Sequence, residues 1–245
     1  MRLSNYKTNN PVFSGYFWEG PKATNKKMTV TGIFFKSLLC ILVIAAITAR
    51  IWKLSEDGMS VRWFTLGGML GAIITSVIIS VRQQWAPILV PIYTIAKGLF
   101  LGGFSAYAHK NFPELPYQAI GVTIVTFLVM LILYQTRIIL VTKKLRSVII
   151  TSAVSIFVVY MISMVLGFFG IKSYIWGTSW FAIAFNCIAA IVASFALLLD
   201  FDYIERYKNR APKSKEWLAT WGLLATLIWL YVEILRLMQK LTKRF

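Results

Sequence analysis

The sequence predicts an all-α fold, a polytopic transmembrane bundle of seven helices. The chain of 245 residues is 58% hydrophobic and 14% charged, whereas soluble domains are usually about 25% charged. Its apolar residues gather in runs of about 20 residues, the length that spans a bilayer as a helix. The runs do not alternate as the strands of a barrel would, and lipid excludes open sheets because every backbone polar group needs an internal partner.

The predicted helices follow one another through short connections. Trp and Tyr residues mark their ends, as expected where amphipathic rings sit at the headgroup level. In chain order the predicted helices are Gly32–Trp52, Trp63–Val81, Ile88–Tyr107, Tyr117–Tyr134, Val148–Phe169, Trp180–Ile204 and Trp217–Leu237.

Three segments follow from these boundaries. Residues 1–31 are polar and interrupted by Pro and Gly, so we expect an N-terminal tail at the membrane surface rather than a cleavable signal peptide. Residues 32–238 form the transmembrane domain, and residues 239–245 form a basic C-terminal tail.

The formal net charge of +17 is explained by the membrane rather than by nucleic acid. Lys and Arg concentrate in the N-terminal tail and in the loops on its side, which predicts a cytoplasmic N-terminus and favourable contact with anionic lipids of the bilayer. No recognition motif for nucleic acid accompanies the charge. The basic C-terminal tail then lies on the opposite side, unless the last helix fails to cross.

Several chemistries lack the residues that they need. His109 is the single histidine, so we expect no metal centre, which needs several nitrogen or sulfur ligands, and no cofactor. No nucleophile has a base beside it in the sequence, so we do not expect an enzyme. The last predicted helix has no lysine near its middle, which disfavours a retinal protein.

The informative residues are ionisable groups in apolar segments, above all Asp200, Asp202, Glu233 and Lys97. An unpaired charge at the bilayer centre costs about 3 kcal/mol or more, so such groups face the bundle interior and often mark ion or proton paths. Asp200 and Asp202 point about 200° apart on a helix. We therefore assign Asp202 to an interfacial set with Glu205 and with Arg206, which lies four residues on, and we assign Asp200 to the interior.

Glu233 has two interpretations. It can form a local ion pair with Arg236, or it can face Asp200 across the bundle, where two close carboxylates would share a proton. Hydropathy places Asp200 near the inner end of its helix and Glu233 toward the outer end of the last helix. The two side chains would meet if the last helix began later than Trp217, or if Asp200 lay deeper than the apolar run implies.

Glycine spacing adds a packing prediction. Gly67 and Gly71, and likewise Gly98 and Gly102, are four residues apart. This spacing lets helix backbones approach closely, and we favour close packing over a ligand site.

The chain also resembles the Bax inhibitor-1 membrane proteins, particularly the bacterial YccA-like branch. The resemblance covers nearly the whole chain. It is carried by "NPVF" (10–13), "KMTVTG" (27–32), "WAPILVPIYTIAKGLFLGGFSA" (85–106), "YQTRIILVTKKLRSVI" (134–149), "LLLDFDYIE" (197–205) and "APKSKEWLATWGLLATLIWLYVEILRLM" (211–238).

The resemblance implies six helices around a central seventh, a bacterial inner membrane, and a pH-sensitive calcium leak channel. By local motif, Asp200 and Glu233 match a proton-sensing carboxylate pair on helices six and seven, and Arg82 matches an arginine that latches onto it. Low pH would close the path for calcium, and raised pH would open it. Lys97 departs from the pattern, because relatives commonly carry an acid there and an ammonium would repel calcium. The alternative function is a non-transporting regulator that binds another membrane protein, such as a protease complex.

Overall fold

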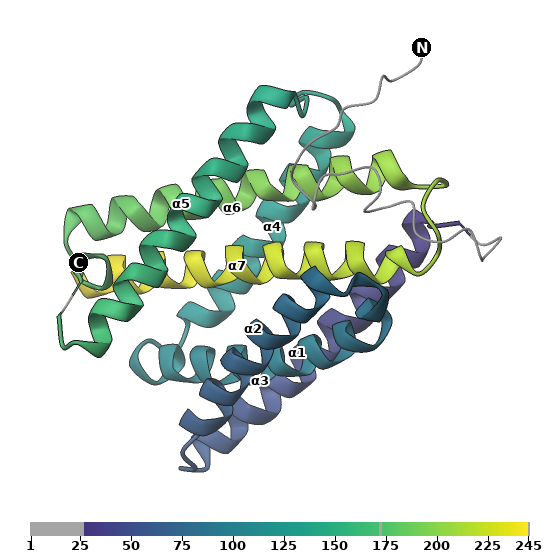
Figure 1. Ribbon diagram of the computed structural model, residues 1–245. Coiled ribbons are helices and arrows are strands. Elements are labelled where there is room, and N and C mark those ends of the chain that lie inside the picture. The colour runs from purple at the N-terminus through teal and green to yellow at the C-terminus, as the bar shows by residue number, and fades with distance from the viewer. Residues whose placement is uncertain (1–26, 172, 245) are drawn as a thin grey trace. The chain divides into compact units, whose positions relative to one another are not determined.

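A computed structural model describes residues 27–171 and 173–244 of the chain (Figure 1). Seven of its helices are long and apolar enough to cross a membrane, which confirms the prediction of an all-α, polytopic fold. The elements, in chain order, are α1 (Val30–Glu56), α2 (Arg62–Val81), η2 (Gln83–Trp85), α3 (Ala86–Asn111), α4 (Leu115–Gln135), α5 (Lys143–Phe168), η3 (Tyr174–Trp176), α6 (Trp180–Tyr207) and α7 (Lys215–Arg244).

Local sequence explains several of the helix ends. Thr29 caps α1 by accepting a hydrogen bond from the Gly32 amide at 3.0 Å, and Thr142 caps α5 by accepting one from Leu145 at 3.1 Å. Each hydroxyl satisfies an amide that has no partner within its helix. Gly170, with φ of 76°, follows the end of α5 in the left-handed conformation that favours glycine.

The chain forms two compact units, and three helices contribute to both. The first unit runs to Phe104 and includes Tyr203–Gly222, so it holds α1, α2, most of α3, the connection from α6 to α7 and the first turns of α7. The second unit, Ser105–Asp202 with Leu223–Phe245, holds α4, α5, most of α6 and the rest of α7.

Close helix packing in the first unit depends on glycine. The structure confirms the packing that the spacing predicted for Gly98 and Gly102. A Cβ at Gly98 would lie 2.9 Å from Ile47, and one at Gly102 would lie 2.6 Å from Ile51, so both let α3 approach α1. In α2 the close contact is at Gly68, where a Cβ would meet the α3 backbone at 2.6 Å. A Cβ at Gly67 would meet no atom within 4 Å, so the prediction for that position was off by one residue.

A short backbone pairing holds the residues before α1 against the α6–α7 connection within the first unit. The Met28 amide donates to the Ala211 carbonyl at 2.8 Å, and the Asn209 amide donates to the Met28 carbonyl at 2.9 Å. Met28 is fully buried. Residues 1–26 of the predicted surface tail lie outside the described residues.

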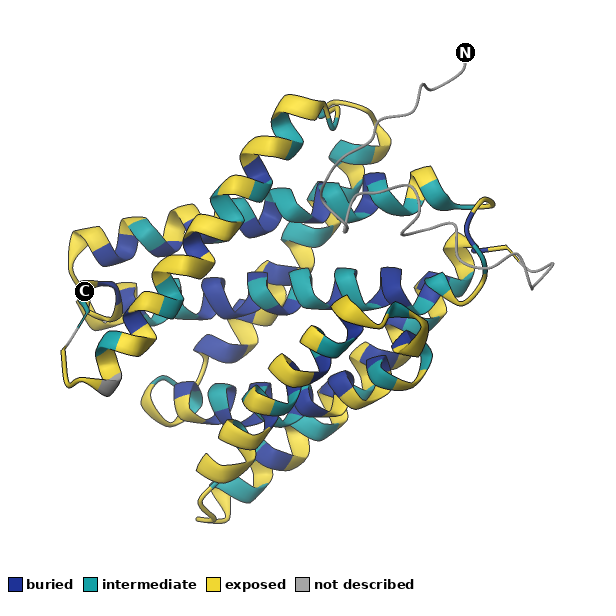
Figure 2. Cartoon of the chain, in the orientation of Figure 1, coloured by how far each residue is buried: buried dark blue, intermediate teal, exposed yellow. Residues whose placement is uncertain are grey.

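The last helix differs in length and burial from the others. In its most apolar stretch α7 is 67% buried, against 11% for α4, and Figure 2 shows most of its ribbon in the colours of buried and intermediate residues. The central position of the seventh helix stays a prediction. It also continues to Arg244, through residues 239–244 that the sequence suggested to be a tail. The physical reason is that Lys240 is buried and hydrogen-bonded rather than solvated.

Candidate functional site

Asp200 lies in the last two turns of α6, within the second unit. The residue is half-buried, and its Oδ2 atom is fully enclosed without a hydrogen-bond partner in the structure. Across from it, α7 presents Thr226, whose hydroxyl lies within hydrogen-bonding reach of the carboxyl group. The side chain that faces Asp200 from α7 is therefore a neutral hydroxyl.

Glu233 lies elsewhere along α7, in a dense set of hydrogen-bond donors. It is 1% exposed. Its Oε2 accepts from the Tyr160 hydroxyl at 2.8 Å and from the Asn186 amide at 2.7 Å. Its Oε1 accepts from the Trp229 indole at 3.1 Å and lies 3.7 Å from the Arg236 guanidinium. The carboxylate is thus solvated by the protein itself, which offsets the cost of burying its charge.

The structure does not bring the carboxyls of Asp200 and Glu233 together. Helices α6 and α7 run antiparallel in the second unit, since Asp200 lies beside Thr226 whereas Asn186 binds Glu233. Thr226 and Glu233 are seven residues apart, which is about 10 Å along the axis.

Hydropathy alone had placed the two carboxyls at different depths, and the structure agrees with it. The pairing of Glu233 with Asp200 required either a later start of the last helix or a deeper position of Asp200, and α7 begins at Lys215. The pair of Glu233 with Arg236, the other interpretation, is present.

Asp202 has a partner that the sequence did not suggest. It is 8% exposed and forms an ion pair with Arg146, which projects from the first turn of α5. The expected pair with Arg206, one turn further along α6, stays a prediction. The neighbouring Glu205 is exposed and pairs with Lys208 at 2.6 Å. Asp202 therefore joins α5 to α6, which agrees with a structural role.

Arg82 and Lys97 both belong to the first unit. Arg82 follows the last turn of α2 and is exposed. The Lys97 ammonium lies over the rings of Tyr93 and Phe100, 5.6 Å from each ring centre. Aromatic faces attract a cation and partly replace its lost water. The latch at Arg82 and the influence of Lys97 on the acidic groups stay predictions.

Within the first unit, Lys36 and Glu216 form a hydrogen-bonded ion pair. Glu216, in the first turn of α7, is fully buried. It accepts hydrogen bonds from the Thr29 amide at 2.9 Å and the Thr29 hydroxyl at 3.0 Å, and it pairs with the Lys36 ammonium. The charge of Lys36 in an apolar helix is thereby explained as an anchor between α1 and α7.

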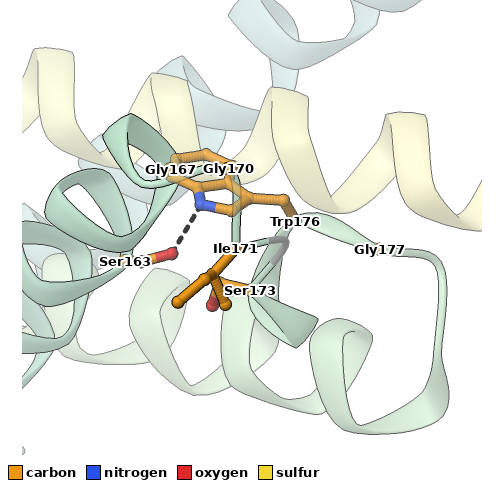
Figure 3. Close-up of a pocket in the computed structure, with 7 residues that line it drawn as sticks. All are labelled: Ser163, Gly167, Gly170, Ile171, Ser173, Trp176 and Gly177. Atoms are coloured by element: carbon orange, nitrogen blue, oxygen red, sulfur yellow. Dashed lines mark hydrogen bonds between the residues drawn. The ribbon is translucent and has the colours of Figure 1, made fainter.

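One pocket in the second unit has a volume of about 520 Å³ and lies where α5 ends (Figure 3). Trp176 forms one wall, and its indole nitrogen donates to the Ser163 hydroxyl at 2.6 Å. The remaining lining residues are Gly167, Gly170, Ile171, Ser173 and Gly177. None of the predicted site residues lines this pocket.

Clusters of candidate metal ligands are absent from the described part of the chain. No group of three His, Cys, Asp or Glu side chains there is close enough to hold a metal ion. A calcium ion that reached Asp200 would therefore meet one carboxylate and the Thr226 hydroxyl, far fewer than the six to eight oxygen ligands of a tight calcium site.

Sequence reasoning missed most partners of the ionisable groups. Thr226, Tyr160 and Asn186 are ordinary residues of apolar helices, and their pairing depends on the register between helices. Asn186 gave the one usable signal, since an amide in the run "FAIAFNCIAAI" needs a hydrogen-bond partner in lipid.

Comparison with known proteins places the chain in a family. A family model described as Bax inhibitor 1 like matches residues 10–243. No curated protein and no solved structure gives a significant match. The family match covers nearly the entire sequence and agrees with seven membrane-spanning helices, so the chain belongs to the Bax inhibitor 1 like family of multi-pass membrane proteins.

Proposed function

We propose that this protein is a pH-sensitive cation leak channel, with calcium as the cation and Asp200 as the proton-sensing group. The observation that carries the proposal is the enclosed Oδ2 atom of Asp200, which has no hydrogen-bond partner in the structure. A carboxyl group is costly to keep in a membrane-spanning helix, and such groups usually serve ion or proton movement.

The few ligands around Asp200 favour conduction of a cation over tight binding of it. Conduction requires a site that attracts an ion and also releases it. One carboxylate with the Thr226 hydroxyl beside it meets this requirement better than a complete cage would. Ionised Asp200 would attract the cation, and protonated Asp200 would not. Flux should therefore be high at raised pH and low at acidic pH.

The roles of the other predicted residues follow from their surroundings. Glu233 has donors on both carboxylate oxygens, so the proposal assigns proton sensing to Asp200 alone and gives Glu233 an anchoring role. Arg82 remains the proposed latch, by resemblance to the family. The bacterial inner membrane remains the proposed location, with a cytoplasmic N-terminus.

The test is calcium flux into proteoliposomes that contain a trapped calcium dye, measured between about pH 6 and about pH 8. Wild-type flux should rise with pH, and Asp200→Asn should abolish this rise because an amide cannot ionise. Glu205→Gln is the matched control, since Glu205 is an exposed acid on the same helix. Thr226→Asp should move the rise in flux to higher pH, because a second carboxyl beside Asp200 opposes its ionisation.

Two results would contradict the proposal. The first is pH-dependent flux that Asp200→Asn leaves unchanged. The second is an absence of wild-type flux in vesicles that contain correctly folded protein. A stoichiometric membrane-protein partner that co-purifies with the non-conducting protein would instead support the regulator function.

A further inference from the structure

Lys240 lies in the last turns of α7 and is enclosed, with 8% of the residue exposed. Its ammonium donates to the Ile175 carbonyl at 2.5 Å, to the Ala182 carbonyl at 3.1 Å and to the Asn186 side-chain oxygen. These oxygens come from the 3₁₀ turn η3 and from the first two turns of α6. An ammonium has three N–H donors, and each has one acceptor here.

The amide of Asn186 is oriented by charges on both sides. Its oxygen accepts from Lys240, and its nitrogen donates to Glu233 at 2.7 Å. An amide placed this way presents its acceptor to a cation and its donor to an anion. Arg236 adds a second cation, 3.7 Å from Glu233, with its guanidinium 5.0 Å from the Tyr160 ring centre and 5.1 Å from that of Trp176.

We propose that these three oxygens form a binding cage for a small primary ammonium ion, which the chain fills with its own Lys240 side chain. The cage is defined by the Ile175 and Ala182 carbonyls and the Asn186 oxygen. It is separate from Asp200, which lies 14 residues after Asn186, or about 21 Å along α6. The Lys240 ammonium holds the end of α7 against the start of α6. When the Lys240 side chain is truncated, the cage binds an external primary ammonium ion.

The experiment is chemical rescue of the full chain in detergent. Lys240→Ala deletes three carbons and the ammonium, and propylammonium supplies the same atoms. The melting temperature of Lys240→Ala should fall by at least about 3 °C, which corresponds to a loss of roughly 1 kcal/mol in a chain of this size. Propylammonium should restore much of that loss. Tetramethylammonium, with the same charge and no N–H donor, should not.

Two further variants separate the cage from general effects. Lys240→Met keeps an apolar stem in the space and should be destabilised without rescue. Lys243→Ala alters an exposed lysine of the same helix end and should respond to neither ion, as should the wild type. If Lys240→Ala yields folded protein only when purified with propylammonium, the proposal is also supported.

Three results would overturn the proposal of an ammonium-binding cage. One is an equal response of Lys240→Ala to both ions. Another is a melting temperature of Lys240→Ala equal to that of the wild type. The third is a failure to recover folded Lys240→Ala under any of these conditions while Lys240→Met folds.

Discussion

At the scale of single residues, the same side-chain chemistry serves different purposes according to its partners. Asp200 has an enclosed oxygen without a partner, Asp202 has an arginine, and Glu233 has three hydrogen-bond donors. Glu216 is fully buried and anchored by Thr29 and Lys36. A charged group with a complete set of hydrogen-bond partners holds helices together. A carboxyl group with one oxygen that lacks a partner is available to bind a proton or a cation.

Gly32 gives a residue-scale prediction. A Cβ at this position would lie 2.5 Å from the Glu216 carboxylate. The carboxylate would have to shift and so disturb its contacts with Thr29 and Lys36. Gly32→Ala should therefore lower the melting temperature in detergent, although alanine favours a helix over glycine by about 1 kcal/mol.

Gly67→Ala is the matched control, because a Cβ at Gly67 meets no atom within 4 Å. This control should be neutral or slightly stabilising. A melting temperature of Gly32→Ala at or above the wild-type value would show that the Glu216 contacts contribute little.

At the scale of helices, ion pairs and glycines decide which surfaces meet. Within the second unit Arg146 of α5 binds Asp202 of α6, and within the first unit Lys36 of α1 binds Glu216 of α7. Lipid is as apolar as the helix surfaces, so apolar contact alone discriminates poorly between helix pairings in a membrane. Polar contacts and close backbone approach supply the missing specificity.

The Arg146–Asp202 pair can be tested with Asp202→Asn. This partly buried pair should contribute about 1–2 kcal/mol, between the values typical of exposed and of buried pairs. Asp202→Asn should lower the melting temperature while leaving the pH dependence of calcium flux in place, because Asp202 is an anchor and not the sensor. Glu205→Gln should change neither quantity. Loss of the pH dependence in Asp202→Asn would move the sensor to Asp202.

At the scale of the whole molecule, an odd number of spans predicts that the two ends of the chain lie on opposite sides of the membrane. The charge distribution predicts a cytoplasmic N-terminus, and α7 is long enough to cross fully because it extends from Lys215 to Arg244. The basic end of α7 then lies on the non-cytoplasmic side. Buried Lys240 at this end makes hydrogen bonds within the protein, so its charge is poorly placed to act in loop-charge sorting.

Reporter fusions at each end of the chain measure the side of the membrane on which that end lies. A fluorescent reporter that folds only in the cytoplasm should be bright at the N-terminus and dark at the C-terminus, and a reporter that is active only outside should show the reverse. Equal signals at both ends would mean that one of the seven apolar helices does not cross.

The sequence by itself determined the fold class, the seven helices to within a few residues at most ends, and the family. It could do so because length and hydropathy are local properties, and each span is visible without knowledge of its neighbours. It also identified Asp200, Asp202 and Glu233 as unusual, since charge in an apolar run is equally local.

The tertiary structure alone decided which of these groups meet. In the structure Asp200 faces Thr226, and Asn186 binds both Glu233 and Lys240. These contacts depend on the register between α6 and α7. A shift of one turn, about 5 Å, exchanges one set of partners for another while leaving the hydropathy of both helices unchanged. For that reason the sequence could suggest a pairing of Asp200 with Glu233 that the packed helices do not make.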